Sequence, residues 1–98
     1  MEIIKNANGS QLTISLVGRL DTTTAPSLET EVKEGLGGVT ELFFDFEKLE
    51  YISSAGLRVM LAAQKVMNAQ GSMKVINVCP EIKEVFDITG FVDILTIV

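Results

Sequence analysis

Alternating apolar and polar residues at the start of the chain predict a β-hairpin. Residues 12–17 alternate over most of their length, which is typical of a strand with one buried face. A short apolar pair at residues 3–4 precedes them and predicts the partner strand. Asn8 and Gly9 lie between the two segments, and an Asn-Gly step favours a hairpin turn because both residues tolerate a positive φ.

The following segment predicts an amphipathic helix. It begins near residues 22–26, where a threonine can cap the first turn and a proline is tolerated at its start. Its apolar residues recur at every fourth position and form one stripe, which consists of Leu28, Val32 and Leu36. Gly37 and Gly38 then end the helix.

Strands and helices continue to alternate in the second half of the chain. The dense apolar run at residues 42–46 predicts a central strand that is covered on both faces. After it we expect a helix from Ser53 or Ser54 to about residue 69, a strand at 74–78, a helix over 80–90 and a last strand at 94–98. The sequence therefore predicts an α/β fold with one domain over residues 1–98. Its sheet is expected to be mixed and mostly parallel, with an N-terminal hairpin and about three helices.

Charge and composition narrow the functions open to this fold. Eight Lys and Arg residues against thirteen Asp and Glu residues give a net charge of −5, which argues against nucleic acids and anionic membranes as partners. The chain has no histidine, so it lacks the commonest general base and the commonest neutral metal ligand. Cys79 is the only cysteine, which excludes an internal disulfide and fits a reducing compartment. Since no signal-peptide or membrane-spanning pattern is present, we expect a cytoplasmic protein. Since histidine is absent and only one cysteine is present, we also expect that the chain binds no metal and is not an enzyme.

Residues with carboxylate or hydroxyl side chains lie at one predicted edge of the sheet. Asp21 follows the second strand, Asp45 lies near the end of the third, and the next helix begins at Ser53 and Ser54. The carboxyl ends of parallel strands share an edge, and binding sites form there. The two aspartates are interpreted either as loop residues that accept hydrogen bonds from nearby N–H groups or as the carboxylate pair of a hydrolase.

Ser53 and Ser54 also allow two interpretations. A serine at a helix start can cap the helix by accepting a hydrogen bond from an N–H two or three residues later, which is worth about 1 kcal/mol. An exposed serine at this position can instead accept a phosphoryl group. The phosphate adds about −1.5 to −2 charges, which the helix dipole tolerates and an acidic partner surface does not. Both interpretations hold if one serine caps the helix and the other is modified.

The helix that follows the serines carries an apolar arc and two further leucines. The arc is expected to face the sheet and consists of Val59, Met60, Ala63, Val66 and Met67. Leu57 and Leu61 fall outside this arc, close to Arg58 on the helix surface. These leucines either pack on a neighbouring helix or form a partly exposed docking face with a basic rim. Such a face would suit a partner helix with acidic residues.

Three motifs of the chain resemble those of STAS domains, in particular those of bacterial anti-sigma factor antagonists. They are the Gly-Arg-Leu-Asp sequence that ends at Asp21, the segment 49–61 around Ser54, and the segment 86–91. They fall in the family's order and extend the resemblance over nearly the whole chain. When the chain is matched on its Ala-Gly-Leu sequence at residues 55–57, the family's phosphoserine falls on Ser54.

The resemblance implies a partner-switching cycle. In this cycle the unphosphorylated antagonist binds an anti-sigma factor that is also a serine kinase, and a sigma factor is thereby freed for transcription. The kinase uses its own ATP to phosphorylate Ser54, so no cofactor is implied for this chain, and a serine phosphatase reverses the modification. The expected partner surface consists of Asp21, Thr22, Thr23, Ser53, Ala55, Gly56, Leu57, Arg58 and Leu61.

Departures from the family pattern leave a second function open. Ser53 stands where the family often has an aspartate before the phosphoserine, and Ala55 stands where it often has serine or threonine. Many relatives also carry one more C-terminal helix after the last strand. The alternative is a non-phosphorylated STAS scaffold in a signalling or lipid-transport complex. In either role we expect a monomer or a weak dimer.

Overall fold

The computed structural model describes all residues from 1 to 98. In chain order its elements are β1 (Glu2–Asn8), β2 (Gln11–Leu20), α1 (Ala25–Gly35), β3 (Glu41–Ile52), α2 (Ser54–Gln70), β4 (Ser72–Ile76), α3 (Pro80–Thr89) and a short 3-10 helix, η1 (Phe91–Asp93). The four strands form one sheet in the order β1-β2-β3-β4. β1 and β2 are antiparallel, and the other two pairings are parallel. The predicted mixed, mostly parallel sheet with an N-terminal hairpin and three helices is confirmed.

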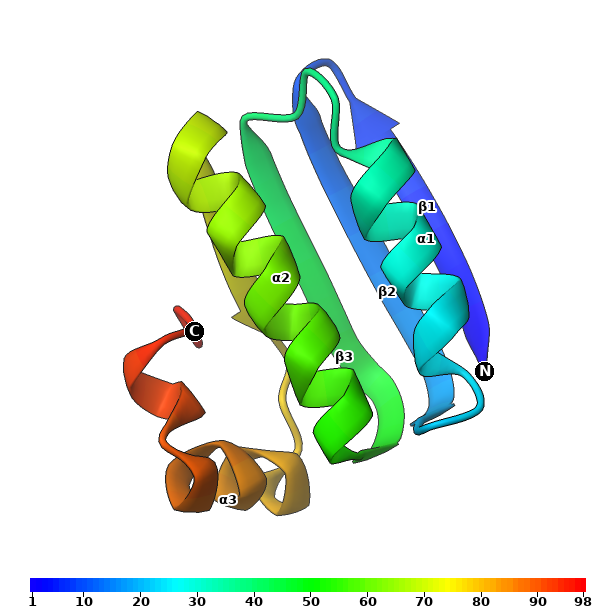
Figure 1. The fold of residues 1–98 in the computed structure, drawn as a ribbon, viewed down its shortest axis with the longest axis vertical. Coiled ribbons are helices and arrows are strands. Elements are labelled where there is room, and N and C mark those ends of the chain that lie inside the picture. The colour runs from blue at the N-terminus through cyan, green and yellow to red at the C-terminus, as the bar shows by residue number, and fades with distance from the viewer.

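The two long helices cover one face of the sheet (Figure 1). α1 connects β2 to β3 and α2 connects β3 to β4, and the two helices lie side by side. α3 lies beyond the carboxyl end of β4. Because β2 and β3 are parallel, the helices that follow them both begin at the same edge of the sheet. This arrangement brings the loops around Asp21 and Ser54 together.

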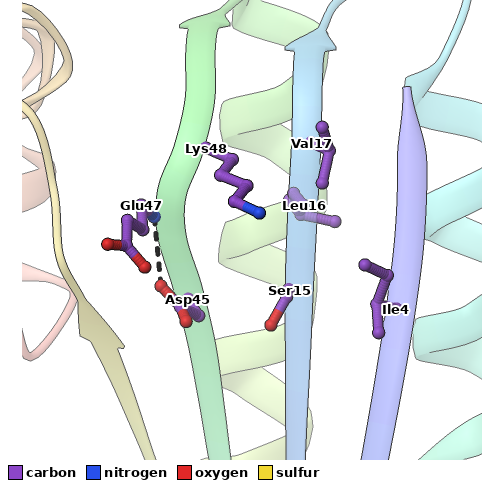
Figure 2. A pocket seen from close by; sticks show the side chains of 7 residues that line it. All are labelled: Ile4, Ser15, Leu16, Val17, Asp45, Glu47 and Lys48. Carbon is purple, nitrogen blue, oxygen red and sulfur yellow. Dashed lines mark hydrogen bonds between the residues drawn. The ribbon is translucent and has the colours of Figure 1, made fainter.

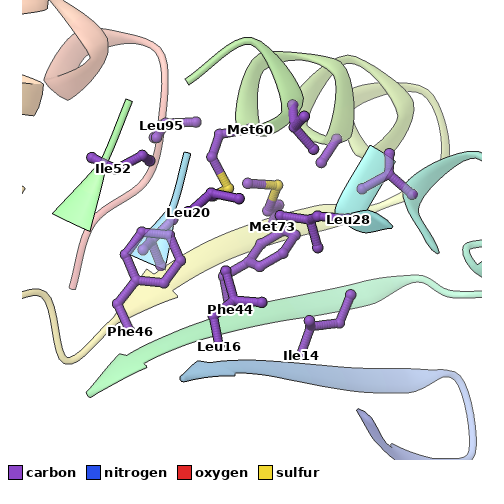
Figure 3. Close-up of a cluster of buried hydrophobic side chains, with 14 of the residues drawn as sticks. Ile14, Leu16, Leu20, Leu28, Phe44, Phe46, Ile52, Met60, Met73 and Leu95 are labelled. Atoms are coloured by element: carbon purple, nitrogen blue, oxygen red, sulfur yellow. The ribbon is translucent and has the colours of Figure 1, made fainter. Parts of the chain in front are cut away.

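The core lies between this sheet face and the helices. Alternate residues of β2 point toward the helices, and among them Ile14 and Leu16 are fully buried. Figure 3 shows these side chains in one cluster with Leu28 of α1 and Met60 of α2. The predicted stripe is entirely buried on α1 and at its C-cap, as is most of the predicted arc on α2. Each large apolar side chain buried in this way contributes about 1.5–3 kcal/mol.

The hairpin has a shorter loop than the sequence suggested. β1 extends through polar residues as far as Asn8, which pairs with Gln11 at the start of β2. Only Gly9 and Ser10 remain in the turn, and Gly9 has a φ of +63°. Such a two-residue loop needs a positive φ, which glycine adopts without steric cost.

The third strand is longer than predicted. The apolar run at residues 42–46 forms only its first half, because β3 continues to Ile52. Its pairing with β2 shifts register after Ser15, and the strand then continues with the buried residue Leu49. A bulge of this kind lets charged residues interrupt an apolar pattern without ending the strand. As a result, Asp45 lies in the middle of β3 and not at the end of a strand.

The predicted last strand at residues 94–98 is wrong. The N–H of Leu95 donates a hydrogen bond to the carbonyl oxygen of Phe91 (2.8 Å), so the turn of η1 continues into this segment. A single bridge follows, between Ile97 and Val75 of β4. Two hydrogen bonds form this bridge, from the N–H of Val75 to the carbonyl oxygen of Thr96 (2.8 Å) and from the N–H of Val98 to the carbonyl oxygen of Val75 (3.0 Å).

Candidate functional site

The Asp21 carboxylate organises the loop after β2. Its Oδ1 accepts hydrogen bonds from the N–H groups of Thr23 (3.0 Å) and Thr24 (3.2 Å) and from the Thr23 hydroxyl (2.8 Å). The Thr23 hydroxyl, followed by the Thr24 and Thr23 N–H groups, holds the pKa of Asp21 below its usual range. Thr24 is the N-cap of α1 but donates its hydroxyl to the carbonyl oxygen of Arg19 (2.9 Å) and forms no side-chain cap bond. The loop-residue interpretation of Asp21 therefore describes its geometry, and the predicted threonine cap does not form.

An exposed cation–π pair adjoins this loop. The guanidinium carbon of Arg19 lies 4.2 Å from the centroid of the Tyr51 ring, and its Nε lies 3.8 Å from Oδ2 of Asp21. Arg19 and Tyr51 are register partners across β2 and β3. Exposed pairs of this kind are worth about 0.5–1 kcal/mol. The sequence does not indicate this pair, because the partner of Arg19 depends on a register that shifts twice.

Ser53 and Ser54 differ in their hydrogen bonds at the start of α2. The N–H of Ser53 donates to the carbonyl oxygen of Leu20 (2.9 Å), which ties the end of β3 to the end of β2. Its Oγ accepts a hydrogen bond from the N–H of Gly56 (3.3 Å), so Ser53 is the N-cap of α2. Ser54 is the first residue of α2, its side chain is exposed, and its hydroxyl forms no hydrogen bond within the protein. The free hydroxyl of the pair thus belongs to Ser54.

Gly56 and Leu57 are buried under the helix start. A Cβ at Gly56 would lie 2.7 Å from Cγ of Leu20 and 2.9 Å from Cγ1 of Ile52, so α2 comes this close to the strand ends only with a glycine here. Leu57 is 6% exposed and belongs to the core, whereas Leu61 is half-buried. Of the two interpretations given for the leucines, the burial of Leu57 favours packing over a docking face.

A shallow depression lies between the first turns of α1 and α2, next to Ser54. Its volume is about 180 Å³, and we call it the α1–α2 depression. It is lined by Thr22, Ala25, Pro26, Glu29, Ala55, Arg58 and Val59. Three of the predicted partner residues thus share one surface feature, and Thr23 is exposed in the adjoining loop. Pro26 and Glu29 were not predicted as part of this surface, although their spacing of three residues places them on one helical face.

The matches of the chain to known proteins identify its family. A model of the STAS domain matches residues 2–98. The chain belongs to the STAS domain family. It is 32% identical to "Putative anti-sigma factor antagonist BtrV" of Bordetella bronchiseptica, over 99% of this chain and 85% of the relative. It is 29% identical to the anti-sigma-B factor antagonist of Bacillus subtilis, over 92% of this chain and 84% of the relative. The structure of phosphorylated SpoIIAA of Bacillus has the same fold, with a TM-score of 0.78 at 21% identity over 99% of this chain and 91% of that chain.

Asp45 of this STAS domain lies away from the serines, on the sheet face that the long helices leave open (Figure 2). Its Oδ1 accepts hydrogen bonds from the N–H of Glu47 (3.0 Å) and from Nδ2 of Asn77 (3.0 Å). Asp45 pairs in register with Ser15, and Asp21 lies six residues further along β2 and its loop, roughly 20 Å away at the rise of a strand. The predicted convergence of the two carboxylates is wrong, so the STAS domain offers no carboxylate pair for a hydrolase at this edge.

The remaining surface of the STAS domain adds no second chemical site. A depression of about 170 Å³ on the open sheet face is lined by Ser15, Asp45, Glu47, Lys48 and three apolar residues, and none of its polar side chains is buried (Figure 2). No group of three or more His, Cys, Asp or Glu side chains is placed to hold a metal ion. No helix is both long and apolar enough to cross a membrane.

Proposed function

We propose that this STAS domain is an anti-sigma factor antagonist whose binding to an anti-sigma factor is ended by phosphorylation of Ser54. The similarity to proteins named as antagonists supports the class of partner. The observation that supports the switch is the exposed, unbonded hydroxyl of Ser54 next to the α1–α2 depression. In this proposal the chain acts in the cytoplasm by binding and not by catalysis. The anti-sigma factor is itself the serine kinase, and a serine phosphatase restores the unmodified form.

A phosphate on Ser54 changes the surface charge and leaves the fold in place. Ser53 forms both the N-cap bond of α2 and the hydrogen bond to Leu20, so phosphorylation of Ser54 removes neither of them. The phosphate adds about −1.5 to −2 charges at a helix start, where the dipole favours negative charge. A partner carboxylate about 5 Å away is then repelled by about 3 kcal/mol per unit charge at an effective dielectric constant of about 20, which corresponds to a loss of affinity of roughly 100-fold or more.

The predicted partner residues contribute to this surface in different ways. Thr23 and Arg58 are exposed and Thr22 lines the depression, so these side chains are available for direct contact. Gly56 and Leu57 are buried and act by holding α2 close to the strand ends. The proposed interface is therefore a small polar surface with a cation beside the switch.

The direct test is incubation of the chain with a cognate anti-sigma factor kinase and ATP, followed by mass spectrometry of the peptides. We expect one phosphate, located on Ser54. Ser54→Ala should accept none and should bind the anti-sigma factor constitutively, whereas Ser54→Asp should fold normally and bind weakly. Ser53→Ala is the matched control, because it loses the N-cap at a cost of about 1 kcal/mol and retains the acceptor hydroxyl of Ser54.

Two outcomes would contradict the switch. One is a phosphate on another residue or on none. The other is recovery of the unmodified chain in a stable multi-subunit assembly, which would favour the scaffold role that Ser53, in place of an aspartate, leaves open.

A further inference from the structure

We propose that Arg58 binds the phosphate of phosphorylated Ser54 within the same chain, and that this contact withdraws Arg58 from the partner surface. The inference rests on the proposed function, because it concerns the modified form of Ser54. Arg58 follows Ser54 by four residues in α2, which is one helical turn. The Cβ atoms of residues at this spacing lie about 5–6 Å apart on one face of a helix, so a guanidinium group on the long arginine side chain reaches a phosphate on the serine.

Arg58 is a free cation in the unmodified protein. The structure contains three salt bridges, and none of them includes Arg58. The other arginine, Arg19, is already engaged with Tyr51 and Asp21. Arg58 is exposed at the rim of the α1–α2 depression, so its guanidinium group is available to a new anion.

The acidic groups near Arg58 compete poorly with a phosphate. Glu29 lines the same depression, but its salt bridge is to Lys33, one turn along α1 (3.9 Å). Asp21, in the loop before α1, already accepts hydrogen bonds from Thr23 and its neighbour. A phosphate carries up to twice the charge of a carboxylate and presents three acceptor oxygens. An acidic group four residues before a basic one is also the favourable order in a helix.

The contact gives phosphorylation a double effect on the surface. Before modification, Arg58 lies one turn from Ser54 and is free to pair with an acidic group of a partner. After modification, the phosphate adds negative charge and also holds the nearest cation of the helix. Both changes oppose the same acidic partner, so one covalent event both introduces a repulsion and removes an attraction.

The test is a phosphorus NMR titration of the full chain with phosphoserine incorporated at residue 54 during synthesis. The second pKa of the phosphate should be lower in the parent than in Arg58→Gln by about 0.3 unit, the shift expected of an ion pair at this helical spacing. Arg58→Lys should retain at least half of that shift. Lys65→Gln is the matched control, because Lys65 is exposed on the same helical face but lies 11 residues from Ser54, or about 16 Å along the helix axis.

The inference is overturned if the phosphate of Arg58→Gln titrates like that of the parent. It is equally overturned if Lys65→Gln raises the pKa as much as Arg58→Gln does, because the effect would then be one of net charge. Neither result depends on a kinase or a partner. A phosphate pKa that is lower in the parent than in Arg58→Gln, together with no kinase product at Ser54, would support the contact and reject the proposed function. Equal phosphate pKa values in the parent and Arg58→Gln, together with a kinase product at Ser54, would support the switch and reject the role of Arg58.

Discussion

Replacement of Gly71 by alanine should destabilise the domain strongly, because the turn between α2 and β4 has no room for a methyl group. A Cβ at Gly71 would lie 2.6 Å from the carbonyl carbon of Thr40 and closer still to the carbonyl oxygen. The backbone of Thr40 is held on both sides. Its oxygen accepts a hydrogen bond from the N–H of Ser72 (2.9 Å), and its N–H donates to the carbonyl oxygen of Ser10 (2.9 Å). Relief of the overlap therefore requires movement of the β3–β4 junction.

The expected size of this effect follows from the two terms involved. Overpacking in a rigid environment costs about 1–3 kcal/mol, and the lost Ser72–Thr40 hydrogen bond adds about 1 kcal/mol. The sum of about 2–4 kcal/mol is a large part of the roughly 5–15 kcal/mol that stabilises a domain of this kind. With a urea m-value of about 1.5 kcal/mol per molar, the unfolding midpoint should fall by about 1–3 M.

Urea unfolding followed by circular dichroism measures this change, and Gly37→Ala is the matched control. Nothing lies within 4 Å of a Cβ at Gly37, so this variant reports how the loss of a glycine restricts the unfolded chain. It should be neutral or more stable than the parent by up to about 1 kcal/mol. Equal midpoints for Gly71→Ala and Gly37→Ala would refute the steric reasoning.

Two further predictions concern polar groups. The lowered pKa of Asp21 means that its contribution to stability is present above the unfolded-state pKa of about 4 and is lost as the pH falls through the lower folded-state pKa. In urea titrations, the difference in unfolding free energy between the parent and Asp21→Asn should be constant near neutral pH and shrink below about pH 4; growth of the difference on acidification would contradict this. Gln64 is 7% exposed and donates to Asn68, but its Oε1 has no hydrogen-bond partner. Gln64→Met should therefore raise the unfolding free energy by about 1 kcal/mol in a thermal melt, and a loss of stability would show that the oxygen is satisfied.

The parts of the fold that the sequence predicts well are those with a local, repeated signal. The stripe of Leu28, Val32 and Leu36 is buried throughout, with the first two residues on α1 and Leu36 at its C-cap. Gly71 and Gly90 follow the last turns of α2 and α3, as expected of glycines that end helices. In each case the deciding interactions lie within a few residues of one another in the chain.

The parts that could not be predicted depend on contacts between distant segments. The continuation of β3 past Glu47 depends on a register shift against β2, and neither strand carries a local signal for it. A second shift, between Gly18 and Arg19, sets Arg19 opposite Tyr51, and the continuation of β3 leaves Asp45 in mid-strand. The burial of Leu57 was open for a related reason, because a helical wheel does not show how deeply a helix start sits against the strand ends.

The sequence predicted that one of the two serines caps the helix, but the residue types alone did not show which one. Either residue type suits an N-cap, so composition cannot distinguish Ser53 from Ser54. The distinction arises from the extended backbone at Ser53, which has a φ of −96° and a ψ of 176° and directs its hydroxyl toward the N–H of Gly56. The next residue already has helical geometry, and its side chain is exposed to solvent.

For the proposed switch, the different hydrogen bonds of Ser53 and Ser54 predict how a partner distinguishes the unmodified and phosphorylated forms. Ser53 holds the helix start and Asp21 holds the neighbouring loop, so the shape of the surface does not depend on the Ser54 hydroxyl. A partner must then recognise the modification by its charge. Interactions between exposed charges are screened over about 10 Å at 0.1 M salt and about 3 Å at 1 M salt. In calorimetric titrations with the anti-sigma factor, the ratio of affinities for the unmodified and phosphorylated forms should therefore fall as salt is raised between these concentrations. A ratio that does not change with salt would mean that phosphorylation alters the shape of this edge, and that Ser53 and Asp21 do not hold it as the structure indicates.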